Sequence, residues 1–369
     1  MRKIGIIGAG LCGLTIAQRL LRNMNDIEVV IFEKQPYGGG NLRERNLNGT
    51  IVHMHGPHIF HTKSENVWKF IKQFTTWEPY FHEVTAFIKG QAVPVPFNFK
   101  SIDMIFGNNG QFMKTAIIDE FGFGSRVPIL KLLESHNSHL NLLGDEIFRS
   151  VYKGYTEKQW GKPISEVANS VLSRVPVVAS YDSRYFNDKY QYLPKYGYNE
   201  LIDNMSKSIN IKYNNNIDVD NKKLSNFDHV FCTSAIDEFF KYSLGKLDYR
   251  SLSFEQIDGS ADTPYYETCQ TNFPNEYEFT RVAKYGFLKS QTNKPIFIAE
   301  YPKDCGENDH KYYPVSNDET KALFSLYKEK SKQIKNLTFA GRLADFKYYN
   351  MDQVIARGLK VSDTFMNKN

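Results

Sequence analysis

The sequence contains few cysteines and no long apolar run. Its 369 residues include four cysteines, which lie far apart and form no C-x-x-C pair: Cys12, Cys232, Cys269 and Cys305. This spacing indicates neither a zinc site nor a disulfide framework, and it suits a reducing compartment. No stretch reaches the roughly 18 consecutive apolar residues of a membrane-spanning helix, and the apolar N-terminal stretch leads into a glycine motif rather than a signal-peptide cleavage site. We therefore expect a cytoplasmic protein without a membrane span.

The chain also lacks a strong charge bias, internal repeats and low-complexity segments. Its formal net charge is +5 and its lysines and arginines are dispersed, so no basic stripe points to nucleic acid or to an anionic membrane. An anionic small molecule needs only a local cluster of cations. A hydrophobic fraction of 41% and a charged fraction of 24% are typical of a globular protein. The length predicts two or three domains.

The clearest pattern is an apolar run followed by closely spaced glycines near the N-terminus. Residues 3–7 form a predicted strand, and G-A-G-L-C-G follows at residues 8–13. G-x-G-x-x-G between a strand and a helix is typical of dinucleotide-binding domains. In such a turn Gly8 bends the chain, Gly10 lets the backbone approach a pyrophosphate, and Gly13 lets helix and strand pack closely.

The elements after the glycines complete this pattern. A helix is predicted over residues 11–22 and a strand over 27–32, which ends at Glu33, twenty residues after Gly13. An acid at this position accepts hydrogen bonds from the ribose of a bound adenosine. A second glycine run at residues 38–40 provides backbone without Cβ atoms that a cofactor can approach. These features predict a bound dinucleotide and leave open whether it is NAD or FAD.

Four histidines lie within nine residues, at His53, His55, His58 and His61. A metal site is one hypothesis for such a cluster. However, the run contains no Asp or Glu, and a Gly-Pro turn interrupts its spacing. We therefore expect no metal at this position.

The middle of the chain changes its pattern several times. A short helix is predicted over residues 68–74, a turn over 77–80, and a hairpin with a Lys-Gly tip over 84–99. Two prolines near the end of the hairpin restrict its second strand to a sheet edge or a loop. Leucines and isoleucines then recur among polar residues from about 101 to 151, which predicts a small helical domain.

The last part of the chain returns to strand and helix patterns. Residues 228–233 and 336–341 are predicted to be strands of the first sheet. After a loop, Asn350 and Gln353 form a capping-box pattern that begins a helix. The positive end of this helix would face an anionic group, which suits a reduced flavin ring.

Four longer motifs occur in order along the chain. They are K-G-Y-T-x-K-Q-W-G at residues 153–161, G-P-H-I-F-H-T at 56–62, V-P-x-P-F-N at 93–98 and Y-Y-N-M-D-Q at 348–353. With these motifs the chain resembles the UDP-galactopyranose mutases, bacterial flavoenzymes that convert UDP-galactopyranose to UDP-galactofuranose. The resemblance covers nearly the whole chain.

The resemblance implies an unusual use of the cofactor. It implies a non-covalent FAD that must be reduced although the reaction is redox-neutral, with flavin N5 attacking the anomeric carbon to give an N5–sugar adduct. The sugar ring then opens and recloses as a furanose. Covalent catalysis of this kind divides one difficult rearrangement into easier steps. The resemblance also implies a nucleotide-sugar substrate, a homodimer, and a reductant such as NAD(P)H or a flavin reductase.

The resemblance assigns roles residue by residue. The expected cofactor-binding residues are Gly8, Gly10, Gly13, Glu33, Gly39, Gly40, Asn41, His58, His61, Arg342, Met351 and Asp352. The expected substrate-binding residues are Tyr155, Thr156, Trp160, Tyr185, Arg250, Asn272, Arg281, Tyr313 and Tyr348. The expected catalytic residues are His58, Arg281 and Arg342. Arginine suits this chemistry because its planar fork binds phosphate oxygens in pairs.

The predicted fold class is α/β with three parts. A discontinuous FAD-binding domain of Rossmann type is expected from residues 1–85, 212–245 and 318–369. A helical domain is expected from residues 100–150. An antiparallel-sheet substrate domain is expected from residues 86–99, 151–211 and 246–317, with the nucleotide sugar in the cleft between the domains.

One departure from the family pattern bears on the substrate. The family has an arginine on a mobile loop four residues after the position of Arg174, and this chain has Val178 there. Losing one charge-assisted hydrogen bond costs about 1.5–3 kcal/mol, or roughly ten- to a hundredfold in affinity. Either another cation such as Arg184 or Lys195 compensates, or the loop closes on a different nucleotide sugar.

Several functions therefore stay open beside a UDP-galactopyranose mutase. The chain can be a dTDP-fucopyranose or UDP-N-acetylgalactosamine mutase, which the Val178 departure favours. A flavin oxidoreductase on the same fold would consume oxygen or another acceptor during turnover. A catalytically inactive flavoprotein would bind cofactor and nucleotide sugar without forming the N5 adduct.

Overall fold

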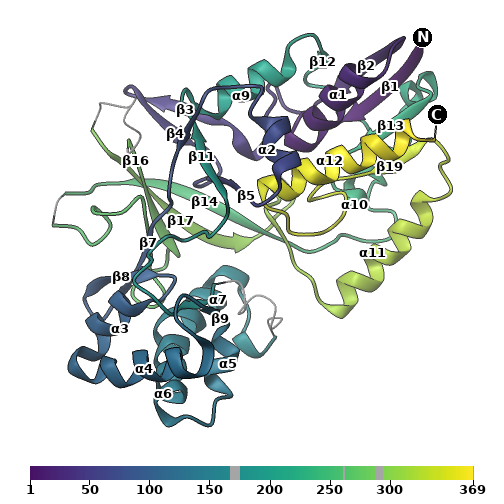
Figure 1. The fold of residues 1–369 in the computed structure, drawn as a ribbon. Helices are drawn as coiled ribbons and strands as arrows, with labels where there is room; N and C mark the ends of the chain where they lie inside the picture. Colours follow the sequence, from purple (N-terminus) through teal and green to yellow (C-terminus); the bar gives the residue numbers. More distant parts are fainter. Residues whose placement is uncertain (167–174, 261, 287–293, 369) are drawn as a thin grey trace.

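The computed structural model describes residues 1–166, 175–260, 262–286 and 294–368 (Figure 1). In Figure 1 the N-terminal strands lie at the upper right beside the C-terminal helix, and a group of helices lies at the lower left. A long antiparallel-rich sheet lies between these two parts. Among the described residues, no helix is long and apolar enough to cross a membrane.

A five-stranded parallel sheet holds the glycine motif. Its order is β12-β2-β1-β13-β19, and every neighbouring pair is parallel. The strands are β1 (Arg2–Ile7), β2 (Ile27–Phe32), β12 (Asn210–Lys212), β13 (His229–Cys232) and β19 (Leu337–Phe339). The order reverses at β1, which has β2 on one side and β13 on the other; in open α/β sheets, ligands bind at the carboxyl ends of the strands beside such a reversal. The strands predicted at 228–233 and 336–341 are confirmed as members of this sheet.

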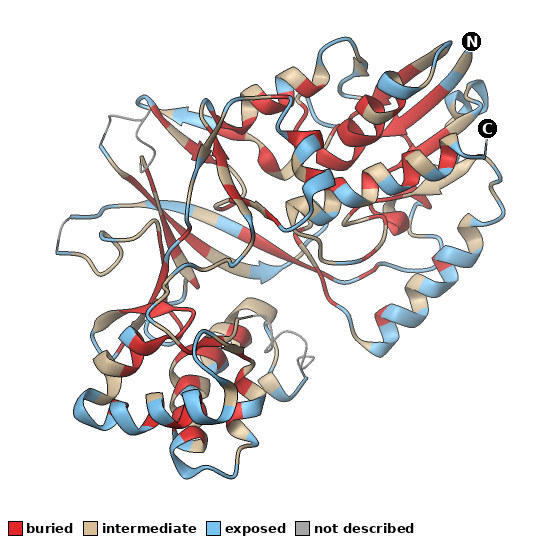
Figure 2. Cartoon of the chain, viewed as in Figure 1, coloured by how far each residue is buried: buried red, intermediate tan, exposed pale blue. Residues whose placement is uncertain are grey.

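Alternate residues of this sheet enter two different cores. Val29 and Ile31 of β2 pack into the core shared with α1 (Leu11–Asn23) and α12 (Met351–Met366). Val30 and Phe32 enter the core on the opposite face, which includes residues of α10 (Ile236–Phe239) and α11 (Asp318–Ser331). Burying such a side chain contributes about 1.5–3 kcal/mol. Helices on both faces of a parallel sheet explain why its inner strands β1, β2 and β13 are mostly buried (Figure 2).

One segment expected in the substrate domain packs with the glycine motif instead. Helix α9 (Gly197–Ser206) places Leu201, Ile202 and Met205 in the same core as α1. Residues 151–211 are expected in the antiparallel-sheet domain, whereas α9 packs in the core of α1. Its apolar face is buried against α1, a contact between distant segments that sequence spacing does not reveal.

The second large sheet is mostly antiparallel and has seven strands in the order β18-β14-β17-β16-β15-β7-β8. They are β7 (Val84–Ile88), β8 (Gln91–Val95), β14 (Tyr249–Ile257), β15 (Gln270–Asn272), β16 (Arg281–Tyr285), β17 (Ile296–Asp304) and β18 (Tyr313–Pro314). The predicted hairpin is confirmed as β7–β8, with Lys89 and Gly90 both at positive φ in its turn. Strand β8 lies at the sheet edge, as its prolines require.

Five further short strands and one helix lie outside the two large sheets. They are β3 (Glu44–Leu47), β4 (Thr50–His53), β5 (Phe60–Thr62), β6 (Trp77–Pro79), β11 (Tyr190–Pro194) and α2 (Glu65–Ile71). The turn predicted at residues 77–80 is wrong, because β6 pairs with β11. The helix predicted at 68–74 begins earlier, where the Ser64 side chain accepts a hydrogen bond from the Val67 N–H.

The helical region shares one core with the β7–β8 hairpin. Its elements are α3 (Phe99–Phe106), α4 (Gly110–Phe121), α5 (Ile129–Leu133), α6 (Ser138–Ile147), a π-helical turn (Phe148–Lys153) and α7 (Gly154–Trp160). The helical pattern predicted from 101 to 151 is confirmed except at β9 (Arg126–Val127), which pairs antiparallel with β10 (Val177–Val178). This two-residue ladder ties the helical region to the chain that follows α7.

Candidate active site

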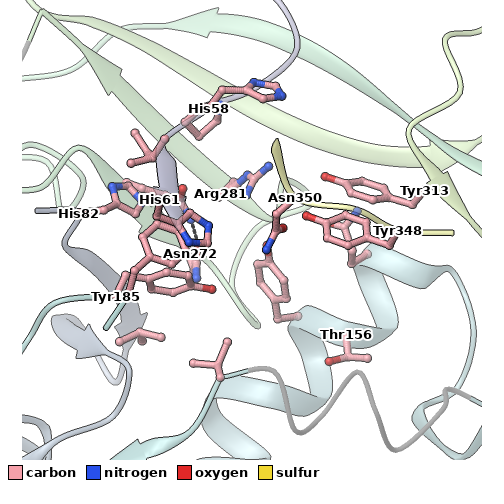
Figure 3. Close-up of a pocket in the computed structure, with 18 of the residues that line it drawn as sticks. His58, His61, His82, Thr156, Tyr185, Asn272, Arg281, Tyr313, Tyr348 and Asn350 are labelled. Carbon is pink, nitrogen blue, oxygen red and sulfur yellow. Dashed lines mark hydrogen bonds between the residues drawn. The ribbon is translucent and has the colours of Figure 1, made fainter. Parts of the chain in front are cut away.

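A cavity of about 670 Å³ opens where the histidine segment, the long sheet and α7 meet. Figure 3 shows Tyr313 and Tyr348 beside one another at one end and His61, His82 and Tyr185 toward the other. The expected site residues that line it are Asn41, His58, His61, Tyr155, Thr156, Trp160, Tyr185, Asn272, Arg281, Tyr313, Arg342, Tyr348 and Met351. One cavity therefore brings together expected cofactor-binding and expected substrate-binding residues.

The glycine turn has the geometry that a dinucleotide requires. Gly8 has a φ of 100°, which side chains rarely adopt. A Cβ on Gly13 would lie 2.0 Å from the carbonyl oxygen of Gly8, so only glycine fits there. A Cβ on Gly10 would meet nothing within 4 Å, and no side chain caps the N-terminus of α1. The turn therefore leaves open space in front of uncapped helix N–H groups, which is where a pyrophosphate binds.

Two neighbouring polar residues are already engaged within the protein. Glu33 Oε2 accepts a hydrogen bond from the Ala9 N–H at 2.7 Å, and its Oε1 accepts one from the Gln35 N–H at 2.9 Å. Each carboxylate oxygen keeps a second lone pair for a ribose hydroxyl. Asn41 Oδ1 lies 2.6 Å from His310 Nε2 at the cavity wall.

Arg281 is held in the cavity by a buried carboxylate. Its Nε and one terminal nitrogen donate to Glu300 Oε2 at 2.9 and 2.7 Å, and Glu300 is 2% exposed. Burial opposes the positive charge of Arg281, but Glu300, Tyr155 and Tyr313 outweigh it and raise its pKa well above the usual range. The guanidinium therefore stays charged and oriented, while Glu300 Oε1 has no partner among the described residues.

Tyrosines surround Arg281 and Arg342. The rings of Tyr313 and Tyr348 stack with centroids 5.7 Å apart, and the Arg342 guanidinium lies 4.9 Å from the Tyr348 centroid. Arg342 also donates to the carbonyl oxygen of Tyr349 at 2.6 and 3.2 Å. Burial raises the pKa of Tyr155 to about 12. Burial also raises the pKa of Tyr313, so the phenols of Tyr155 and Tyr313 stay protonated near neutral pH and can donate hydrogen bonds to a phosphate.

Each of the four clustered histidines forms a hydrogen bond within the protein, and His53 Nδ1 accepts one from the His58 N–H at 3.0 Å. His55 Nδ1 lies 2.6 Å from the Tyr312 hydroxyl, His58 Nδ1 lies 2.8 Å from the Gly56 carbonyl oxygen, and His61 Nδ1 lies 2.5 Å from Asp188 Oδ2. The ring of His61 also stacks on Phe186, with centroids 3.6 Å apart. Within the described parts of the chain, no group of three or more side chains is arranged to hold a metal ion.

Two cavity histidines should make the fold sensitive to acid. Burial, and secondarily their positively charged or histidine neighbours, lowers the pKa of both His58 and His82 from 6.5 to about 3. Between these pH values the unfolded chain binds protons that the folded chain does not, so stability is full above about pH 6.5 and falls as the pH drops. Each histidine should contribute a loss of about 1.4 kcal/mol per pH unit.

Urea unfolding at about pH 7 and about pH 5 measures this loss. His82→Gln should reduce the acid-induced loss by the share of one histidine. His139→Gln is the matched control, because His139 is exposed on α6, and it should not change the loss. An equal loss in both variants and in the unmodified protein would show that His82 is not responsible.

Some expected residues do not reach this cavity. Arg250 is 6% exposed and forms an ion pair with Asp304, and it donates to the carbonyl oxygen of Gln159 at 3.1 Å. It lines a second, smaller hollow on the other side of Trp160. Asp352 accepts a hydrogen bond from Thr62 at 3.0 Å and does not line the cavity either. The glycines, Glu33 and the Gly39-Gly40 turn lie beside β1, outside the cavity lining.

The compensating cations that we considered for Val178 also lie elsewhere. Arg184 is bound to Asp182 at 2.8 Å, and neither Arg184 nor Lys195 lines the cavity. Val178 is buried in β10, directly opposite Arg126 of β9, and Arg126 does line the cavity. No motif marks Arg126 in the sequence. Arg174 lies outside the described residues.

The sequence of this chain is similar to those of known proteins. A family model described as UDP-galactopyranose mutase matches residues 150–348, and a model described as NAD(P)-binding Rossmann-like domain matches residues 6–74. The chain is 33% identical over 373 residues to a probable UDP-galactopyranose mutase from Klebsiella pneumoniae, covering 99% of this chain and 95% of that one. It is 32% identical over 393 residues to a dTDP-fucopyranose mutase from Escherichia coli, covering 100% of both.

Solved structures share the fold at lower sequence identity. A crystal structure of reduced UDP-galactopyranose mutase superposes with a TM-score of 0.73 at 15% identity, covering 100% of this chain and 94% of that one. A putative protoporphyrinogen oxidase from Exiguobacterium sp. 255-15 superposes with a TM-score of 0.64 at 12% identity, covering 100% and 99%. The predicted fold class, a Rossmann-type domain with a helical region and an antiparallel-rich sheet, is confirmed.

Proposed function

This chain belongs to the UDP-galactopyranose mutase family and is an isomerase, and from this we propose that it interconverts UDP-galactopyranose and UDP-galactofuranose with the help of a reduced FAD. The observation that carries the proposal is the single cavity lined by Asn41, His58 and Arg342 on the expected cofactor side and by Tyr155, Arg281 and Tyr313 on the expected substrate side. A reaction between a cofactor and a sugar requires both to reach one space.

The residues present fit a dinucleotide cofactor. The pyrophosphate would lie against the uncapped N-terminus of α1, in the open space in front of Gly10. The flavin ring would lie near His58, Arg342 and Met351, at the N-terminus of α12. When bound in its reduced form, FAD would supply N5 as a nucleophile for the anomeric carbon.

The protein's own residues would bind and orient the substrate. Arg281 is fixed by Glu300, and its other N–H groups, which donate to no other described residue, would meet the diphosphate. Tyr313 and Tyr348 would donate hydrogen bonds to phosphate oxygens, and charge stabilisation of the departing diphosphate would follow from these groups. Aromatic side chains at Tyr155 and Trp160 provide flat surfaces on which a base can stack.

The choice of nucleotide sugar is the finer part of the proposal. Relatives named for UDP-galactopyranose and for dTDP-fucopyranose match this chain at 33% and 32% identity. dTDP-fucopyranose is therefore the second candidate substrate, and UDP-N-acetylgalactosamine the third. We propose UDP-galactopyranose first because the family model and further relatives carry that name.

A substrate panel tests the proposal. The dithionite-reduced protein is offered each of the three nucleotide sugars, and pyranose and furanose forms are separated by chromatography. We expect the largest kcat/KM with UDP-galactopyranose. A larger value with dTDP-fucopyranose or with UDP-N-acetylgalactosamine would reassign the substrate within the family. Oxygen consumption during turnover without any furanose product would instead indicate an oxidoreductase.

We also propose that a reductant such as NAD(P)H or a flavin reductase keeps the cofactor active, and that the protein is a homodimer. Gel filtration with light scattering tests the dimer. Anaerobic mixing with NADH and with NADPH, followed by the flavin absorbance, tests the reductant.

A further inference from the structure

Arg126 has no assigned role, although it lines the candidate active site. It belongs to the short ladder between β9 and β10, where its register partner is Val178. Residues directly opposite one another in an antiparallel pair place their side chains on the same face. Arg126 therefore brings a cation to the face on which Val178 brings an apolar side chain.

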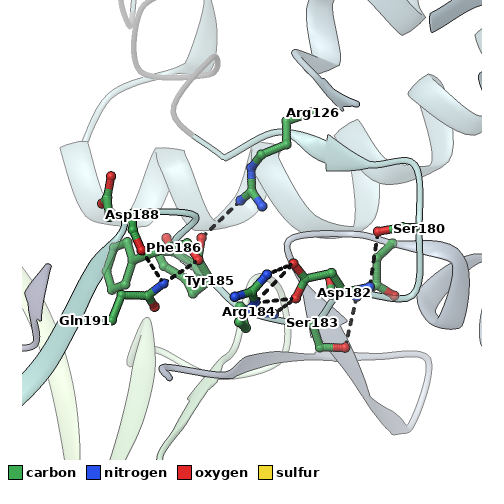
Figure 4. A network of polar contacts seen from close by, with 10 residues as sticks. Arg126, Ser180, Asp182, Ser183, Arg184, Tyr185, Phe186, Asp188 and Gln191 are labelled. Carbon is green, nitrogen blue, oxygen red and sulfur yellow. Dashed lines mark hydrogen bonds and ion pairs between the residues drawn. The ribbon is translucent and has the colours of Figure 1, made fainter. Parts of the chain in front are cut away.

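The guanidinium of Arg126 is only partly satisfied within the protein. One nitrogen donates to the backbone carbonyl oxygen of Tyr185 at 3.1 Å (Figure 4). Considering residues 1–166, 175–260, 262–286 and 294–368, no carboxylate oxygen lies within 4.0 Å of it. The two carboxylates that act electrostatically on Arg126 are each bound to another group. Asp182 binds Arg184, and Asp188 binds His61.

The environment of Arg126 gives its charge little compensation. Burial lowers the pKa of Arg126 most, Asp182 and Asp188 raise it, and Arg184 lowers it. Since both of these acids are paired with other groups, an anion in the cavity would stabilise the half-buried cation further. A guanidinium carries five N–H donors, and among the residues that the structure describes Arg126 donates one hydrogen bond, to the neutral carbonyl oxygen of Tyr185. The remaining donors are available to a ligand in the cavity.

Two of the three arginines that line the cavity form no ion pair with a described carboxylate. Arg281 is neutralised by Glu300, whereas Arg126 and Arg342 contact only carbonyl oxygens and rings among the described residues. Tyr185, whose carbonyl oxygen accepts the hydrogen bond from Arg126, also lines the cavity and contributes to the electrostatic surroundings of Tyr155. The part of a nucleotide sugar that requires two forked cations is its diphosphate.

We propose that Arg126 binds the diphosphate of the nucleotide sugar and thereby contributes to substrate affinity. This inference rests on the proposed function. If Arg126 binds the diphosphate, the helical region contacts the substrate directly, through a residue of the β9–β10 ladder. Arg126 donates both to the Tyr185 carbonyl and to phosphate oxygen, so it also positions Tyr185 relative to the ligand.

Calorimetric titration of the cofactor-loaded protein with UDP, UMP and uridine tests this inference. Arg126→Ala should weaken UDP binding roughly ten- to a hundredfold, weaken UMP binding less, and leave uridine binding within about twofold. Arg126→Lys keeps the charge without the fork and should recover part of the UDP affinity. The UDP affinity of Arg126→Ala should also depend less on salt concentration.

Arg184→Ala is the matched control, because Arg184 is an exposed neighbour paired with Asp182 that does not line the cavity. It should bind UDP like the unmodified protein. Equal losses of UDP and uridine affinity in Arg126→Ala would overturn the phosphate contact in favour of a base contact or a structural role. Unchanged UDP affinity would overturn the inference altogether. Failure of the unmodified protein to bind UDP would instead overturn the proposed function, and this inference with it.

Discussion

Gly10→Val should yield a folded protein that has lost its dinucleotide cofactor. A Cβ at this position meets no atom within 4 Å, and the φ of −77° accepts a side chain. The fold itself therefore tolerates the change, at a cost of about 1 kcal/mol for a poor helix cap. In dinucleotide-binding domains, however, the pyrophosphate approaches the backbone at this glycine. The valine methyl groups would fill that space.

The measurement is the flavin absorbance of the purified protein together with its unfolding midpoint. Gly13→Ala provides the contrast, because its Cβ would lie 2.0 Å from the Gly8 carbonyl oxygen and 3.3 Å from a methyl group of Ile6. That variant should lose stability as well as cofactor, since the helix must move away from the strand. Full flavin content in a stable Gly10→Val protein would show that the cofactor does not bind at this turn.

Arg281→Ala should lower kcat/KM for the nucleotide sugar by about 10²–10³-fold. Arg281 is the one cavity cation that a buried carboxylate holds in place among the described residues, so its loss removes an oriented charge that needs no reorganisation during the reaction. The same change leaves Glu300 buried without its partner, which destabilises a protein by about 3–5 kcal/mol.

Two further variants separate catalysis from stability. Arg281→Lys keeps a charge near Glu300 but loses the fork, so it should fold well and recover only part of the activity. The double variant Arg281→Met with Glu300→Gln removes both charges and should regain much of the lost stability without regaining activity. Activity of the double variant near that of the unmodified protein would contradict a direct role for Arg281 in the reaction.

The nucleotide-binding part of the fold could be predicted because its signals are local. The continuous apolar run of β2, the spacing of the glycines, and the acid at Glu33 are each recognised by rules that act over a few residues. The same holds for the β7–β8 hairpin, whose Lys-Gly tip adopts positive φ.

The parts that could not be predicted depend on pairings between distant segments. Arg126 reaches the cavity only because β9 pairs with β10, and two residues are too few to give a strand pattern. His61 and Asp188 meet across 127 positions of the sequence. The apolar face of α9 packs into the core of α1. An apolar face predicts that a helix is buried but does not identify the element that it packs against.

The length of a motif does not decide which residues suggested by family resemblance line the cavity. Tyr155 and Tyr348 of the long motifs line it, whereas Asp352, in the same motif as Tyr348, does not. Arg250 stood in a short motif, and its guanidinium is instead held by Asp304 and by backbone carbonyl oxygens beside a second hollow. The role predicted for Arg250 in substrate binding stays a prediction.

The central claim is that the isomerisation requires reduced FAD, and one experiment tests it most directly. The protein is incubated with UDP-galactopyranose without oxygen, either oxidised or reduced by dithionite, and cyanoborohydride is added to capture a covalent flavin–sugar product. We expect furanose and the captured product only in the reduced sample. Equal conversion by the oxidised protein, or conversion in the reduced sample without any captured product, would contradict the account.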